Sequence, residues 1–324
     1  MTNESIDKIL ITGGAGFIGS NFIHYFLKKY PEKTVVNLDK LTYCGNLENL
    51  KGIDTYPNYK FAQGDICDEK IVDSLMKDAD AIIHFAAESH VDNSIKDPLI
   101  FTKTNVLGTH VLLESAKQHG LKKFLHISTD EVYGSIKEGS FKETDPLSPS
   151  SPYSSSKAAA ELIARSFYHT FDLPLIVVRL SNTFGPRQYP EKLVPLFVTN
   201  LLENKKVPLM GKGENIRSWI YVEDACSAID TVFQNGAVGE IYNIPGTGEL
   251  KNVEVTKMLL SLLGKDESSI EEIPHRLGHD FRYSVDGSKL AALGWKASYS
   301  LEKAFAETVS WYQKNEEWWR KLKK

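Results

Sequence analysis

A glycine-rich turn at residues 13–19 is the feature that most constrains how this chain can fold. Its sequence, GGAGFIG, follows the β-branched run KILIT and opens the helical pattern FIGSNFIHYFLKK. A strand, a turn built on Gly13, Gly16 and Gly19, and a helix in this order aim backbone N–H groups and the helix dipole at an anion. The turn therefore predicts a parallel α/β sheet with a pyrophosphate site at its edge.

Apolar runs that resemble strands recur along the first 180 residues and alternate with helical patterns. After KILIT they read TVVNLD, YKFAQ, AIIHFA, KFLHIS and LIVVRLS. Short apolar strands separated by helices predict parallel pairing with helices on both faces of the sheet. The expected fold class is α/β, a Rossmann-like doubly wound parallel sheet with a smaller C-terminal α/β domain that binds substrate.

The composition changes after residue 180, where NTFGPRQYPEK is rich in Gly, Pro and polar residues and a helical pattern follows. The segment 219–247 again has a strand, helix and strand pattern, so we expect the chain to return to the first sheet there. We therefore predict a dinucleotide-binding domain from 1–180 and 219–247. The predicted substrate-binding domain comprises 181–218 and 248–324.

Asp39 ends the run TVVNLD, about 20 residues after Gly19. At this spacing an acid accepts hydrogen bonds from the adenosine ribose, and its charge would repel a ribose 2′-phosphate. The expected cofactor is therefore NAD rather than NADP. The neighbouring Lys40 argues the other way, because a cation there could pair with that phosphate.

Composition and charge exclude several classes of protein. The 324 residues are 42% hydrophobic and carry a net charge of −4, so we expect a globular chain with no nucleic-acid partner. The opening MTNESIDKIL lacks the features of a signal peptide, and no apolar run reaches about 18 residues, which predicts a cytoplasmic protein with no membrane partner. The three cysteines have no C-x-x-C spacing and are expected to be reduced thiols.

The stretch STDEVYG at 128–134 places a hydroxyl and two carboxylates at the end of a predicted strand. Adjacent residues on a regular strand point to opposite faces, so Asp130 and Glu131 can act together only if the strand has ended by Asp130. A solvated acidic loop is the simpler interpretation when this stretch is taken alone. Its neighbours therefore decide whether it carries chemistry.

The pair Tyr153 and Lys157 is one of five matches to Y-x-x-x-K in the chain, so the spacing alone identifies nothing. This pair follows the loop DPLSPSSP and begins a helical pattern, which places both side chains on one face. A nearby ammonium and a nicotinamide cation would lower the phenol pKa from about 10 and create a base for a sugar hydroxyl. A solvated helix start remains the alternative.

The glycine turn, Thr129 and the Tyr153/Lys157 pair together resemble the extended short-chain dehydrogenase/reductase family that acts on nucleotide sugars. Within this family, six stretches of the chain closely resemble the dTDP-glucose 4,6-dehydratases. They are AAESHVDNSI, STDEVYG, SPYSSSKAAAE, YPEKLVPLF, GENIRSWIYVEDAC and RLGHDFRYSVDGSKL. The stretch SNTFGPRQYP departs from the family's NNYGPYQFP at Thr183, Phe184 and Arg187. This departure makes the substrate less certain than the reaction class.

The resemblance implies an NAD-dependent hydro-lyase that oxidises dTDP-glucose at carbon-4, eliminates water across carbons 5 and 6, and returns the hydride to carbon-6. Such a reaction supplies a 4-keto-6-deoxy sugar, a precursor of rhamnose. In this pattern Thr129 bonds the sugar, and Tyr153 with Lys157 removes the carbon-4 hydroxyl proton. Glu131 removes the carbon-5 proton, and Asp130 protonates the leaving hydroxyl, for which burial and the Glu131 charge would keep it neutral.

The resemblance also implies the binding residues and the assembly. The NAD site would comprise Gly13, Gly16, Phe17, Ile18, Gly19, Asp39, Asp65, Ile66, Ala86, Tyr153 and Lys157. The nucleotide sugar would contact Ser89, His90, Asn182, Lys192, Arg217, Asn252 and Arg276. A homodimer is expected through helices at 98–120 and 154–171. No metal is expected, since Pro274 and Gly278 disfavour the helix that would align His275 with His279.

Other activities remain open. A nucleotide-sugar 4-epimerase or decarboxylase would share the glycines, Tyr153 and Lys157, but simple epimerisation needs no acid and base for elimination. A non-catalytic dinucleotide-binding regulator could use the same fold, because fold does not fix function. Such a regulator would not need Tyr153 or Lys157.

Overall fold

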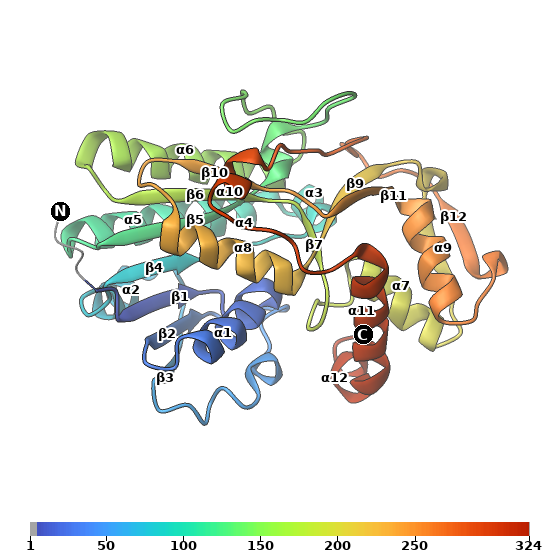
Figure 1. Ribbon diagram of the computed structural model, residues 1–324, viewed down its shortest axis with the longest axis horizontal. Helices are drawn as coiled ribbons and strands as arrows, with labels where there is room; N and C mark the ends of the chain where they lie inside the picture. Colours follow the sequence, from blue (N-terminus) through green and yellow to red (C-terminus); the bar gives the residue numbers. More distant parts are fainter. Residues whose placement is uncertain (1–4, 324) are drawn as a thin grey trace.

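The computed structural model describes residues 5–323, and its centre is a seven-stranded parallel sheet flanked by helices (Figure 1). The strand order is β10-β6-β5-β4-β1-β2-β3, and every neighbouring pair is parallel. Its strands are β1 (Lys8–Thr12), β2 (Thr34–Asp39), β3 (Tyr59–Gln63), β4 (Ala81–His84), β5 (Lys123–Thr129), β6 (Leu175–Leu180) and β10 (Ile241–Ile244). The predicted doubly wound, Rossmann-like sheet is confirmed.

Helices cover both faces of this sheet because successive side chains of each strand point to opposite sides. In β1, Ile9 and Ile11 join an apolar cluster with Phe22 of α1, whereas Leu10 joins a second cluster with Leu112 of α5. The first face carries α1 (Phe17–Lys29) and α8 (Val222–Asn235). The second face carries α2 (Glu69–Met76), α5 (Thr109–Gln118) and α6 (Pro152–Phe171).

The smaller part of the molecule is built on two short sheets beside the carboxyl ends of the central strands (Figure 1). One sheet has the order β11-β9-β7 and the other pairs β12 with β8. The strands are β7 (Asn182–Phe184), β8 (Val207–Met210), β9 (Ile216–Tyr221), β11 (Gly248–Lys251) and β12 (Ile270–Ile273). The helices are α7 (Leu193–Leu202), α9 (Asn252–Leu262), α11 (Leu301–Lys314) and α12 (Glu316–Arg320).

The segment 219–247 returns to the central sheet later than its sequence pattern suggested. Its first strand, β9, pairs with β7 and β11, and only α8 and β10 lie with the central sheet. The sequence of β9, IRSWIY, carries no alternation that distinguishes the two sheets, so the sequence pattern could not choose its partners. The division into two domains stays a prediction.

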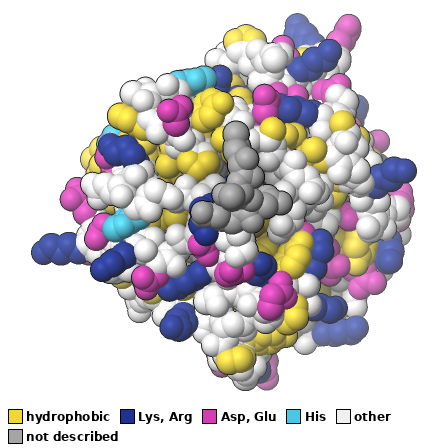
Figure 2. Space-filling model, turned by 60° about the vertical axis from the view of Figure 1, so that its left-hand side comes forward, with side chains coloured by type: hydrophobic (Ala, Val, Ile, Leu, Met, Phe, Trp, Pro, Cys, Tyr) yellow, Lys and Arg dark blue, Asp and Glu magenta, His cyan; other side chains and the backbone are white. Residues whose placement is uncertain are grey.

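The remaining helical elements are short. They are α3 (Val91–Lys96), α4 (Pro98–Phe101), the π-helix η2 (Thr102–Gly108), α10 (Ser288–Ala292), η1 (Leu47–Leu50), η3 (Asp130–Tyr133), η4 (Gly211–Gly213) and η5 (Glu267–Ser269). Across residues 5–323, no helix combines the length and the apolar character needed to cross a bilayer. On the face shown in Figure 2, acidic and basic side chains are interspersed.

A buried ion pair ties α6 to the central sheet. Arg179 of β6 and Glu161 of α6 are both almost fully buried, and the guanidinium donates from Nε to Oε2 at 3.1 Å and from Nη2 to Oε1 at 2.5 Å. The Arg179 guanidinium also lies over the ring of Tyr133 in η3, with its Cζ 4.5 Å from the ring centre. The pair therefore positions α6 relative to the strand ends.

Breaking this pair should destabilise the protein strongly. Glu161→Ala leaves a guanidinium buried without its carboxylate, which costs about 3–5 kcal/mol of unfolding free energy, measured by urea denaturation. Asp78→Asn removes the exposed partner of Lys8 and should cost less than about 1 kcal/mol. Equal losses from the two variants would contradict this account.

Candidate active site

A cavity of about 470 Å³ opens where the carboxyl ends of the central strands meet the smaller part of the molecule. In doubly wound sheets this edge is where ligands bind. All the predicted site residues line the cavity: Gly13, Gly16, Phe17, Ile18, Gly19, Asp39, Asp65, Ile66, Ala86, Ser89, His90, Thr129, Asp130, Glu131, Tyr153, Lys157, Asn182, Lys192, Arg217, Asn252 and Arg276. Their shared location does not test their individual roles, which stay predictions.

The glycine turn has a backbone that only glycine accommodates well. Gly13 has a φ of 73°, and a Cβ there would lie 2.6 Å from the Ala86 nitrogen. A Cβ on Gly19 would lie 2.4 Å from the Gly13 carbonyl oxygen. Gly16 is the N-cap of α1, and no described side chain bonds the first N–H groups of that helix. The geometry therefore fits a pyrophosphate at the start of α1.

Asp39 holds the glycine turn against the loop that follows β2. Its Oδ2 accepts a hydrogen bond from the Ala15 N–H at 2.9 Å, and its Oδ1 accepts one from the Leu41 N–H at 2.8 Å. Burial raises the pKa of this carboxyl, and the two N–H donors oppose the rise. Lys40 pairs with Asp65 at 2.7 Å, so its ammonium is already bound to a carboxylate.

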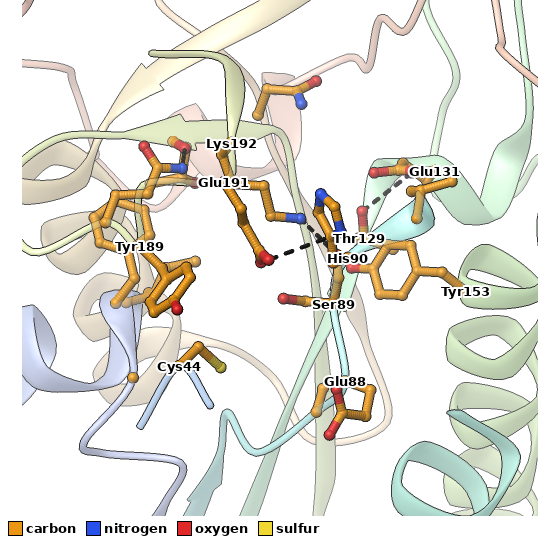
Figure 3. Close-up of a pocket in the computed structure, with 18 of the residues that line it drawn as sticks. Cys44, Glu88, Ser89, His90, Thr129, Glu131, Tyr153, Tyr189, Glu191 and Lys192 are labelled. Atoms are coloured by element: carbon orange, nitrogen blue, oxygen red, sulfur yellow. Dashed lines mark hydrogen bonds and ion pairs between the residues drawn. The ribbon is translucent and has the colours of Figure 1, made fainter. Parts of the chain in front are cut away.

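The stretch STDEVYG changes from strand to helix at the point its chemistry requires. Strand β5 ends at Thr129, and the 3₁₀ helix η3 begins at Asp130, as predicted. The Thr129 hydroxyl accepts a hydrogen bond from the Glu131 N–H at 3.3 Å and so caps the turn. Both acids consequently line the cavity, and Figure 3 shows Thr129 and Glu131 beside the ring of Tyr153.

The two adjacent carboxyls have different electrostatic surroundings. Burial and the neighbouring Glu131 raise the pKa of Asp130 to about 7, and its Oδ2 has no hydrogen-bond partner among the described residues. Burial also raises the pKa of Glu131, but Lys192 and Arg276 oppose that rise. The surroundings therefore favour a proton on Asp130 over one on Glu131.

Tyr153 and Lys157 lie one turn apart at the start of α6, whose N-cap is Ser151. Lys157 Nζ donates to the Ile127 carbonyl at 2.6 Å, and burial lowers its pKa to about 8. Burial and the Glu131 charge raise the pKa of Tyr153. The lowering expected from Lys157 together with a nicotinamide cation is thus not found in the protein alone, where burial dominates the phenol pKa and the Lys157 ammonium bonds the Ile127 carbonyl.

The predicted sugar-nucleotide residues approach the cavity from both parts of the molecule. Arg217 of β9 donates to the carbonyls of Ile216 at 2.7 Å and Asp280 at 2.9 Å. Four buried polar atoms of this group have no hydrogen-bond partner among the described residues, namely His90 Nδ1, Asn182 Oδ1, Asn252 Oδ1 and Arg276 Nε. Unpaired buried polar atoms are rare in proteins, and their presence around one cavity fits a polar ligand.

The three departures from the family pattern differ in their relation to the cavity. Thr183 lines it. Phe184 is fully buried and stacks on Phe305 with ring centres 4.2 Å apart. Arg187 donates from Nη1 to Asn21 Oδ1 at 2.9 Å. Two of the three departures therefore make contacts outside the cavity.

Several lining residues were not predicted although their sequence stretches had been recognised. Asp92 lies in AAESHVDNSI, Glu191 in YPEKLVPLF and His279 in RLGHDFRYSVDGSKL. Charged or titratable side chains within those stretches were the available signal.

His279 Nδ1 lies 3.1 Å from His275 Nδ1, and the described residues contain no group of three or more His, Cys, Asp or Glu suited to a metal ion.

The sequence matches the family model described as GDP-mannose 4,6 dehydratase over residues 10–308. The chain belongs to this dehydratase family. It is 47% identical over 321 residues to a dTDP-glucose 4,6-dehydratase of Streptomyces niveus, an alignment that covers 98% of this chain and 96% of the relative.

Solved structures extend this similarity within and beyond the dehydratases. The crystal structure of DesIV, a dTDP-glucose 4,6-dehydratase from Streptomyces venezuelae with NAD bound, is 48% identical with a TM-score of 0.96, covering 98% of this chain and 100% of that one. A UDP-glucose 4-epimerase from Thermotoga maritima is 31% identical with a TM-score of 0.88, covering 95% and 99%. The chain is therefore more similar to the dehydratase than to the epimerase.

The free energy of unfolding should depend on pH through Asp130. Its pKa rises from an ordinary value near 4 to about 7 on folding, so the protein loses stability as pH rises through that window. Asp130→Asn removes this titration. The unfolding free energy of Asp130→Asn minus that of the unsubstituted protein should therefore rise by at least about 1 kcal/mol from pH 5 to pH 8, measured by urea unfolding. A difference that does not change with pH would contradict the assignment.

Proposed function

We propose that the protein is an NAD-dependent dTDP-glucose 4,6-dehydratase. The observation that carries the proposal is the pair of adjacent carboxyls, the buried Asp130 and the half-buried Glu131, beside Tyr153 in a cavity that starts at a dinucleotide-type glycine turn. Relatives of this activity align over nearly the whole chain. The absence of a long apolar helix in residues 5–323 is compatible with a cytoplasmic location, which we also propose.

The chain has the groups to hold NAD and start the reaction. The N–H groups at the start of α1 would bind the pyrophosphate, and Asp39 would bind the adenosine ribose. When bound, NAD would supply a hydride acceptor for carbon-4 and, in its reduced form, a hydride donor for carbon-6. Tyr153 takes the proton of the carbon-4 hydroxyl, and its raised pKa means that nearby positive charge is needed to make it a base.

The carboxyls then divide the elimination between them. The carbon-4 ketone acidifies the neighbouring carbon-5 proton, which Glu131 removes. Asp130 donates its proton to the carbon-6 hydroxyl, so that the carbon–oxygen bond breaks and water leaves. A pKa of about 7 lets Asp130 carry that proton in a substantial part of the molecules at neutral pH.

The sugar nucleotide would lie between the two parts of the molecule. Arg217 and Arg276 present guanidinium groups suited to a diphosphate, and Asn252 lies beside them along the cavity. Ser89, His90, Asn182 and Lys192 would contact the sugar end together with Thr129. The nucleobase is assigned from the relatives alone.

A nucleotide-sugar 4-epimerase is the second candidate. The overall similarity to a 31% identical epimerase supports it, since the oxidation at carbon-4 would use the same kind of glycine turn and the same Tyr153 and Lys157. Epimerisation gives no role to a neutral acid beside a charged one. The adjacent carboxyls therefore favour dehydration over epimerisation and over a regulator without chemistry.

Separate loss of the two carboxyls should separate the steps of the reaction. Glu131→Gln should slow exchange of the carbon-5 proton with deuterated solvent by about 10²–10⁴-fold, followed by NMR with dTDP-glucose. Asp130→Asn should slow water loss by a similar factor and let enzyme-bound NADH accumulate, followed by its absorbance.

The control for both variants is Glu138→Gln, an exposed acid in the loop after η3, which should leave both rates unchanged. If Glu131→Gln exchanged the carbon-5 proton as fast as the unsubstituted enzyme, Glu131 would not be the base. If a panel of nucleotide-hexoses gave no 4-keto-6-deoxy product, the proposed function would be wrong.

We propose that the protein is a homodimer through the outer surface of η2 and α6. Large apolar side chains are exposed there, including Leu107 at 49% and Leu162 at 53%. A single exposed leucine is common on a protein surface, whereas an apolar face formed by two helices is not. These helices therefore suit a self-complementary contact between two copies of the chain.

Charge at this surface should dissociate the dimer. Leu107→Glu combined with Leu162→Glu buries two carboxylates per subunit and should give a monomer at micromolar concentration in sedimentation experiments. Leu262→Glu, at an exposed position on α9, is the control and should leave the dimer intact. An unsubstituted protein that sediments as a monomer would refute the assembly.

A further inference from the structure

Two segments that are distant in the sequence, and that both contribute residues to the cavity, contact each other through Tyr43. Three of residues 42–45, which follow Asp39, line the cavity, and so do four of residues 188–192, which precede α7. The Tyr43 hydroxyl donates to Glu191 Oε1 at 2.9 Å. The rings of Tyr43 and Tyr189 also pack edge to face, with centres 5.4 Å apart. Figure 3 shows Tyr189, Glu191 and Cys44 around this opening.

The first segment is folded back beside the glycine turn. The Asn46 N–H donates to the Ala15 carbonyl at 3.0 Å, while Asp39 accepts from the Leu41 N–H. Leu41 has a φ of 56°, a left-handed conformation that is uncommon without glycine and persists where surrounding contacts impose it. The chain is thus bent so that Tyr43 contacts the segment before α7.

The second segment is anchored from behind by the C-terminal helices. The Tyr312 hydroxyl donates to the Gln188 carbonyl, and the Tyr189 hydroxyl donates to the Leu322 carbonyl at 3.2 Å. Tyr312 lies on α11 and is fully buried. The segment that carries Glu191 is therefore a fixed support and not a free loop.

The same segment is joined to the loop after β4 on the cavity side. Lys192 Nζ donates to the Ser89 carbonyl at 2.7 Å, and Glu191 Oε2 lies 3.8 Å from His90 Nδ1. These contacts hold the segment that carries Glu191 beside the loop after β4. Tyr43 is exposed to solvent by 41%, so it is the partner that can move away.

We propose that Tyr43 and Glu191 form a clasp that closes the cavity over bound NAD and slows its release. The inference rests on the proposed function in one respect: an enzyme that returns the hydride to its own product regenerates NAD in each turnover and does not need to exchange it. Neither side chain is assigned to the reacting atoms. Tyr43 is a positioning residue that acts through Glu191.

The rate of NAD dissociation tests the clasp directly. The full-length protein is loaded with radiolabelled NAD, chased with excess unlabelled NAD and sampled over time, with no sugar nucleotide present. Tyr43→Phe removes only the hydroxyl and keeps the ring against Tyr189, so dissociation should become about tenfold faster while association changes little. A rate within twofold of the unsubstituted protein would overturn the proposal.

A matched control separates the clasp from a general effect of losing a hydroxyl. Tyr25→Phe also removes a hydroxyl that donates to a carboxylate, that of Asp230 at 3.3 Å, on the α1 and α8 side of the sheet away from the cavity. It should leave the NAD dissociation rate unchanged. Equal acceleration by Tyr25→Phe and Tyr43→Phe would contradict a local clasp.

A double variant tests whether Tyr43 acts through Glu191. Glu191→Ala alone should accelerate dissociation, and adding Tyr43→Phe should then have little further effect, because the hydrogen bond is already lost. Two accelerations that multiply would show independent roles and overturn the clasp. The outcome does not depend on dehydration, since no sugar is turned over, whereas a protein that binds no NAD would instead contradict the proposed cofactor.

Discussion

The parallel register of the central strands is the constraint on which the rest of the site depends. Thr12 of β1 is level with His84 of β4, which is level with His126 of β5. A buried side-chain hydrogen bond of 2.7 Å joins Thr12 to His84 just below the cavity, and His84 in turn contacts Thr109 at 2.9 Å. If one strand slipped by one residue, each of its side chains would move to the other face of the sheet. The fixed register therefore brings the glycine turn and Thr129 to the same edge.

The same edge of the sheet also removes charged groups from water. A carboxyl removed from water favours its neutral form, and a neighbouring carboxylate strengthens that preference. Asp130 is buried and Glu131 is half-buried, and the cations Lys192 and Arg276 oppose the pKa rise of Glu131. Two residues of nearly the same chemistry can thus serve as acid and base. The arrangement also explains why Tyr153 needs positive charge nearby before it can accept a proton.

Much of the fold could be predicted from the sequence, because strands and glycine turns have local signatures. The predicted site residues all line one cavity, while their roles stay predictions. The strand end at Thr129 followed from the need to place Asp130 and Glu131 together. Other features depend on tertiary contacts that local patterns do not encode. The partners of β9, the donation from Lys157 to a backbone carbonyl, and the bond between Tyr43 and Glu191 all arise from segments distant in sequence.

The central claim is that the cavity runs oxidation, elimination and hydride return on one sugar. Turnover of dTDP-glucose that carries deuterium at carbon-4, followed by NMR of the product, tests it most directly. The account predicts a 4-keto-6-deoxy product with that deuterium at carbon-6 and a solvent hydrogen at carbon-5, without added reductant. Deuterium retained at carbon-4 in a sugar of inverted configuration would contradict it and identify an epimerase.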